Sequence, residues 1–156
     1  MEVIRNGVFE TNSSSTHSIC ISRLGSNNDH LQKFPDGFIY VFPNKFGWEE
    51  RIYNDPCTKA SYCLTYVMQF FDHKSMGMNS VLGKDRLEML TKAIALHESV
   101  DEKSVVFSPM SCSCYNWGYI DHQSSGVCSD AFSSIDRLKS FIFNSKSILI
   151  TDNDNH

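Results

Sequence analysis

The hydrophobic positions of this chain fall into short runs and into longer segments of helical spacing. A short apolar run bounded by polar residues or turn signals is typical of a strand. Pro35-Asp36-Gly37 is such a turn, because proline presets φ and glycine accepts a positive φ. We therefore expect strands at Val3-Ile4, Val8-Phe9, Ile19-Cys20-Ile21, 38–42 (as a buried strand), 105–107 and 147–151, and a further strand-like apolar patch at 119–120.

Three segments repeat apolar residues at the spacing of one helical face. The first begins near Cys57, with Asp55 or Thr58 as its cap. The second spans 84–99, with His97 as a favourable cation at its C-terminus, and the third spans 134–144. Their expected buried faces are, in chain order, Ala60, Cys63, Leu64, Val67, Met68 and Phe71; Leu87, Leu90, Ile94 and Leu96; and Ile135, Leu138, Phe141 and Ile142.

These elements predict an α+β fold. The strands do not alternate regularly with helices, which favours a mixed β-sheet with two or three helices packed on one face. A length of 156 residues with 41% hydrophobic residues suits one core. We expect a single domain over residues 1–151, followed by a polar tail at 152–156 that frays.

Charge and hydropathy narrow the environment and the partners. The formal charge is −4 and no block of lysine and arginine occurs, so an extended nucleic acid is not an expected partner. The N-terminus lacks the pattern of a signal peptide, and no apolar run approaches the ~18 residues of a membrane span. We therefore expect a cytoplasmic protein without a membrane partner.

The six cysteines are expected to be free thiols in that environment. Cys63 is expected to be buried on its helix. Cys112 and Cys114 form a C-x-C pair, which is an unspecific zinc signal without a second pair at matching spacing. We expect no metal and no other cofactor.

Two polar segments carry the residues that are best suited to chemistry. One spans 10–18 around His17 and the other spans 121–125 around His122; each places a histidine beside hydroxyls, a carboxylate and a strand-like run. Either histidine alone is typical of a residue that only forms hydrogen bonds within its own loop. If the segments meet in a concave pocket, however, the two histidines could act as acid and base in phosphoryl or phosphodiester transfer.

The candidate residues divide into two roles. His17, His122, Glu10 and Asp121 are the catalytic candidates, and hydroxyls and backbone N–H groups around Ser13 would cradle an anion. Trp48 lies beside two glutamates and could stack on a base or ring, although such a tryptophan is more often a partly buried lid on the core. The candidate ligand-binding residues are Arg5, Asn12, Ser13, Ser14, Ser15, Trp48, Gln123 and Ser124.

Three other chemistries stay open for the same residues. The catalytic candidates could ligate a divalent metal, but they lack the H-E-x-x-H spacing. One of Ser13 to Ser15 could serve a Ser-His-Asp hydrolase, but no G-x-S-x-G elbow occurs. An ADP-ribosyltransferase would use Arg5, the hydroxyls of Ser14-Ser15-Thr16 and a glutamate such as Glu49 or Glu50, an acidic motif too short to be diagnostic.

A resemblance supplements this interpretation. The opening R-N-G-V-F-E-T-N-S-S-S-T-H-S (residues 5–18) resembles that of a family of small proteins carried by bacteriophages and by Firmicutes. Shorter similar pieces are F-G-W-E (46–49), K-A-S-Y (59–62) and G-Y-I-D-H-Q-S (118–124). The resemblance implies a phage context, action inside the host cell and an accessory or anti-defence role.

Our leading interpretation is a protein that binds a phosphate-bearing small molecule, such as a nucleotide, between the two polar segments. Whether it also cleaves or transfers that ligand, as a metal-independent phosphodiesterase or a nucleotide hydrolase or transferase, stays open. The alternative is a non-catalytic anti-defence inhibitor that blocks a host protein with an acidic, aromatic surface. A concave site at the two histidines favours the first, and a flat or convex one favours the second.

Overall fold

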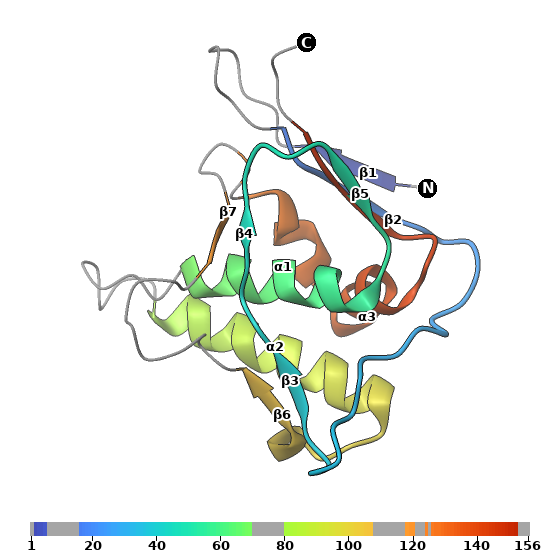
Figure 1. Cartoon of the computed structure of the whole chain (residues 1–156), viewed down its shortest axis with the longest axis vertical. Coiled ribbons are helices and arrows are strands. Elements are labelled where there is room, and N and C mark those ends of the chain that lie inside the picture. Colours follow the sequence, from blue (N-terminus) through green and yellow to red (C-terminus); the bar gives the residue numbers. More distant parts are fainter. Residues whose placement is uncertain are drawn as a thin grey trace.

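The computed structural model describes residues 16–69, 80–107, 118–120, 124 and 126–152, together with the backbone of residues 2–5 (Figure 1). The predicted strand at Val8-Phe9, Phe71 and most of the predicted tail lie outside these residues. So do Cys112 and Cys114, whereas Cys20, Cys57, Cys63 and Cys128 are free cysteines and Cys63 is buried, as predicted.

The described strands form one four-stranded sheet and two separate pairs. The larger sheet has the order β1-β2-β8-β5, and all its neighbours are antiparallel. The two pairs, β3 with β6 and β4 with β7, are parallel. The strands are β1 (Glu2–Arg5), β2 (Ser18–Ile21), β3 (Ile39–Val41), β4 (Lys45–Phe46), β5 (Arg51–Tyr53), β6 (Val105–Phe107), β7 (Tyr119–Ile120) and β8 (Ile148–Thr151).

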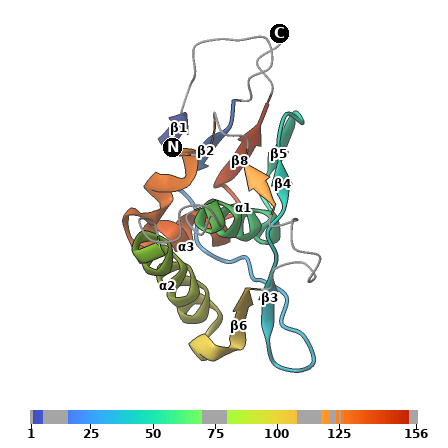
Figure 2. The same cartoon turned by 90° about the vertical axis from the view of Figure 1, so that its left-hand side faces the viewer.

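The helices lie together on one side of the four-stranded sheet, so the predicted α+β architecture is confirmed (Figure 2). Helix α1 (Pro56–Met68) packs against α2 (Ser80–Glu98) and α3 (Ile135–Phe143). Two 3-10 helices, η2 (Glu102–Ser104) and η4 (Val127–Ser133), follow α2 and precede α3. The buried side chains of the helices and of β2, β3 and β8 form one hydrophobic core.

The structure corrects three expectations. Helix α2 begins at Ser80, four residues before the predicted start. Leu96 was expected in the buried stripe of this helix, but it is exposed, and Ala93 and Ala95 are buried instead. The segment 38–42 was expected to be a buried strand, yet only alternate residues of it are buried, because one face of β3 points to solvent.

Asp55 is the residue that caps α1. Its carboxylate accepts the N–H of Thr58 at 2.7 Å, and Pro56 follows at the first helical position. We expect Asp55→Ala to lower the free energy of unfolding by about 1 kcal/mol, because the N–H of Thr58 loses its acceptor. Urea unfolding measures this change, with Asp55→Asn as the matched control that keeps the cap. An alanine variant as stable as the wild type would contradict this assignment.

Candidate functional site

His17 lies immediately before β2, at the point where several distant parts of the chain meet. Its side chain is fully buried. Its ring Nε2 lies 2.7 Å from the backbone carbonyl oxygen of Gly47, which follows β4, and its Nδ1 lies 3.0 Å from the Tyr62 hydroxyl on α1. One imidazole thus joins the start of β2 to the end of β4 and to the middle of α1.

The partners of the His17 ring place a proton on Nε2. A carbonyl oxygen only accepts hydrogen bonds, so Nε2 carries a proton and donates it to Gly47. Burial raises the pKa of Tyr62 well above its ordinary value, so this phenol stays neutral. The arrangement fits a neutral imidazole whose Nδ1 accepts the Tyr62 hydroxyl.

This geometry favours a structural role for His17 over the predicted acid–base role. A ring that exchanges a proton with a substrate needs a nitrogen within hydrogen-bond reach of that substrate. Here both nitrogens are occupied by the protein and the side chain has no exposed surface. Its burial was not visible in the sequence, where a histidine in a hydroxyl-rich run is typical of a solvated turn.

The two predicted polar segments do approach each other at one point. The backbone N–H of His17 donates to Oγ of Ser124 at 3.0 Å, although 107 residues separate them along the chain. Ser124 is also buried. This contact brings the end of the first segment next to the second.

The other candidate site residues are placed as follows. Arg5 belongs to β1, where its backbone pairs with Ser18. Trp48 follows β4 and is 51% exposed, so about half of its surface is covered. The distance between His17 and His122 is not described, because His122 lies outside the described residues. The same holds for Glu10, Asn12, Ser13, Ser14, Ser15, Asp121 and Gln123.

The outer face of β3 carries a row of aromatic side chains that we did not predict as a site. Phe38, Tyr40 and Phe42 alternate with the buried Ile39 and Val41. The ring of Tyr40 lies 6.2 Å from that of Phe38 and 6.5 Å from that of Phe42, centroid to centroid. The period-two spacing of these residues was the signal that could have revealed the row.

Phe34 completes this aromatic row from the preceding turn. Its ring meets the Tyr40 ring edge to face at 5.3 Å. Phe34, Phe38 and Phe42 expose 37%, 37% and 41% of their surfaces. Phe34, Phe38, Tyr40 and Phe42 are called the aromatic row below.

A pocket of about 310 Å³ opens between the aromatic row and the first turns of α1. Leu31, Tyr40 and Phe42 line one side, and Thr58 and Ser61 line the other. A volume near 300 Å³ is at the lower end of the range for ligand pockets. A second pocket, of about 450 Å³, lies between residues 21–27 and α3. His17, Trp48 and Ser124 line neither pocket.

Comparisons with known proteins do not assign this fold to a family. No protein-family model matches the chain, and comparison with the curated proteins and with the solved structures also finds no match. The resemblance of residues 5–18 to phage and Firmicutes proteins therefore stays a prediction. Among the described residues, no helix has the length and apolar character needed to cross a membrane.

Proposed function

We propose that this protein is a non-catalytic binding protein that holds an extended, basic segment of a partner protein on the aromatic row. The observation that carries the proposal is the set of exposed rings beside the 310 Å³ pocket. Contiguous exposed apolar surface of this kind is typical of an interaction site. An extended peptide suits it, because its side chains repeat with the same period as those of β3.

The charge of the row favours a cationic partner. Asp36 lies at one end, where its carboxylate accepts the Tyr40 hydroxyl at 2.6 Å and the N–H of Phe38 at 2.9 Å. These hydrogen bonds lower the pKa of Asp36, so it remains ionised at neutral pH. Arginine combines well with such a surface, since its guanidinium stacks on aromatic rings and pairs with carboxylates.

The pocket is poorly suited to a phosphate. Helix N-termini attract anions through their unpaired N–H groups. At α1, however, the Asp55 carboxylate already accepts the N–H of Thr58, and its negative charge repels a second anion. The net charge of −4 acts in the same direction. These features support a basic peptide in the pocket over a nucleotide.

Selection from a random peptide library tests the proposal. The library is selected on the wild type and counter-selected on the Phe38→Ser/Phe42→Ser variant. We expect the enriched peptides to combine arginine or lysine with apolar residues. A synthetic peptide of the enriched sequence should bind that variant at least about tenfold more weakly, since two aromatic contacts are lost. Fluorescence anisotropy measures this affinity.

The matched control is Ile52→Ser, which removes an even more exposed apolar side chain from β5, away from the row. It should bind the peptide as the wild type does, whereas Asp36→Asn should weaken binding. Enrichment of acidic sequences, or equal binding to the Phe38→Ser/Phe42→Ser variant, would contradict the proposal. So would a selection without enrichment on the wild type.

A phosphate-bearing ligand is the second candidate, and one observation favours it. The hydrogen bond from His17 to Ser124 brings together parts of the two segments that were predicted to form its site. If a nucleotide binds there, it should raise the melting temperature by several degrees at about a hundred times its dissociation constant. A panel of nucleotides and cyclic nucleotides in a thermal-shift assay measures this, and the absence of any shift would contradict this candidate.

A further inference from the structure

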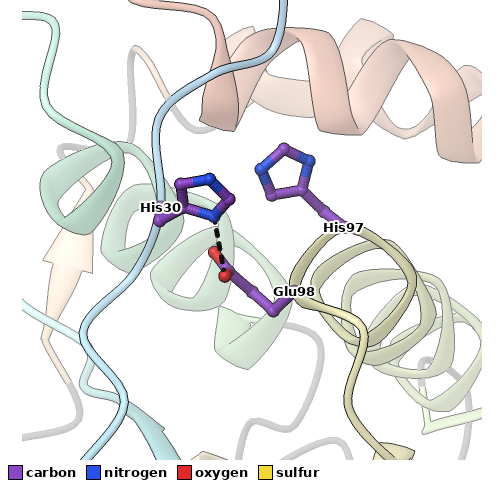
Figure 3. A group of neighbouring side chains, drawn as sticks. All are labelled: His30, His97 and Glu98. Atoms are coloured by element: carbon purple, nitrogen blue, oxygen red, sulfur yellow. Dashed lines mark hydrogen bonds and ion pairs between the residues drawn. The ribbon is translucent and has the colours of Figure 1, made fainter.

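We propose that His30, His97 and Glu98 form a binding site for a divalent transition-metal ion such as Zn²⁺. Figure 3 shows the three side chains gathered between the loop that follows β2 and the C-terminal end of α2. One nitrogen from each histidine and one carboxylate oxygen all lie within 4.8 Å of one another. Two imidazoles and a carboxylate are a ligand set that zinc commonly takes.

The distance between His30 and Glu98 is close to that of two ligands on a bound ion. Nδ1 of His30 lies 3.0 Å from Oε2 of Glu98. Two ligand atoms on a tetrahedral zinc ion with bonds of 2.0–2.1 Å stand about 3.3 Å apart. The wider gap to His97 closes by rotation of His30, whose side chain is 63% exposed and therefore has room to move.

The other two ligands are held in place without a metal. Oε1 of Glu98 accepts the backbone N–H of Leu31 at 2.8 Å, which leaves Oε2 turned toward His30. The His97 ring stacks on Phe143 with a centroid distance of 3.7 Å. Such fixed orientation by surrounding contacts is a feature of metal ligands in proteins, because it lowers the entropy lost on binding.

Metal binding would change the tautomer of His97. Nε2 of His97 donates to the carbonyl oxygen of Asp29 at 2.7 Å. An ion bound by Nε2 takes the place of that proton, which transfers by exchange with solvent to Nδ1, so the ring stays neutral and no net proton is released. The Asp29 carbonyl oxygen, 2.7 Å from Nε2, would have to move outward to make room for the ion. The exposed side of the site leaves room for water as a further ligand.

A bound ion would link two segments that are distant along the chain. His30 and Glu98 are 68 residues apart along the chain. A bound ion would fix the loop at 29–31 to the end of α2, and this loop includes Leu31, which lines the pocket beside the aromatic row. Unlike the proposed function, this site is tested without any partner protein.

Titration of the full-length, reduced and metal-stripped protein with Co²⁺ tests the site. Cobalt reports its own ligands: d–d absorption bands appear on binding, and thiolate ligation adds a charge-transfer band. We expect the wild type to bind one equivalent of cobalt without the thiolate band. His30→Ala and Glu98→Gln should each bind cobalt at least about tenfold more weakly. Zn²⁺ should raise the melting temperature of the wild type and not that of His30→Ala.

Glu102→Gln is the matched control, because it removes an exposed carboxylate four residues beyond Glu98. It should bind cobalt as the wild type does. The His30 side chain is largely exposed, so His30→Ala is expected to fold, and circular dichroism checks this. If the wild type binds no cobalt, or if both ligand variants bind it as tightly as the wild type, the proposed metal site is wrong. His30, His97 and Glu98 then form only a hydrogen-bonded cluster.

Discussion

His17→Ala is expected to lower the free energy of unfolding by about 3 to 5 kcal/mol, a large effect for one polar side chain. The buried carbonyl of Gly47 and the hydroxyl of Tyr62 both lose their hydrogen-bond partner. Each unsatisfied buried group costs about 1–3 kcal/mol, and the space left by the ring adds to this cost. Urea unfolding of the purified variant measures the change.

Two variants separate the structural role of His17 from a general sensitivity of the fold. Tyr62→Phe removes one hydroxyl from the same junction and should cost about 1 to 2 kcal/mol. His30→Ala, in buffer with a chelator, removes an exposed histidine and should cost less than about 1 kcal/mol. A His17→Ala protein as stable as His30→Ala would contradict the structural role and restore the interest of His17 as an acid or base.

The second large effect concerns Lys59, a fully buried cation on α1. Its Nζ donates to the carbonyl oxygens of Asn144 and Ser147, each at 2.8 Å, just beyond the end of α3. Burial lowers the pKa of Lys59 from 10.5 to about 8. The unfolded chain therefore binds this proton more tightly than the folded protein does.

The sign of the pH dependence follows from that difference. Below pH 8 the lysine is charged in both states and the folded state bears the cost of burying the charge. As the pH rises from about 8 to 10.5, the folded protein loses the proton first, and this cost disappears. We expect the wild type to gain about 3 kcal/mol of stability relative to Lys59→Met between pH 7 and 10.5.

Lys59→Met is the matched variant because it keeps an unbranched side chain and cannot titrate. Tyrosines and cysteines titrate in both proteins over the same range, so the comparison cancels most of their effect. Chemical unfolding at a series of pH values measures the difference. A constant difference between the two proteins across this range would show that the lysine keeps an ordinary pKa.

The local sequence determined the three helices and most of the strand positions. Helix α3 follows from apolar residues at helical spacing after Ser134, and α1 follows from the cap at Asp55 and the proline after it. These signals lie within a few residues of each other, so they act before any tertiary contact forms. The short strands β4 and β5 had no comparable signal, because two or three residues become a strand only through their partners β7 and β8.

The direction in which side chains point was decided by tertiary packing. The run at 38–42 is aromatic or aliphatic throughout. The aromatic residues fall at every second position, but hydrophobicity alone does not say which of the two faces packs on the core. The aromatic row exists because β3 turns one face to the core and the other face to solvent. Leu96 is exposed for a similar reason, since α2 turns Ala93 and Ala95 toward its neighbours.

The chemistry of the histidines was likewise decided by contacts across the chain. The sequence supplied a histidine among hydroxyls at position 17, but its burial depends on Gly47 and Tyr62, which lie 30 and 45 residues away. From the sequence alone, His97 is interpreted as a cation at a helix end. Only the approach of the loop at 29–31 places His30 beside it. Residue types are local properties of a sequence, whereas accessibility and ligand geometry arise from segments that fold together.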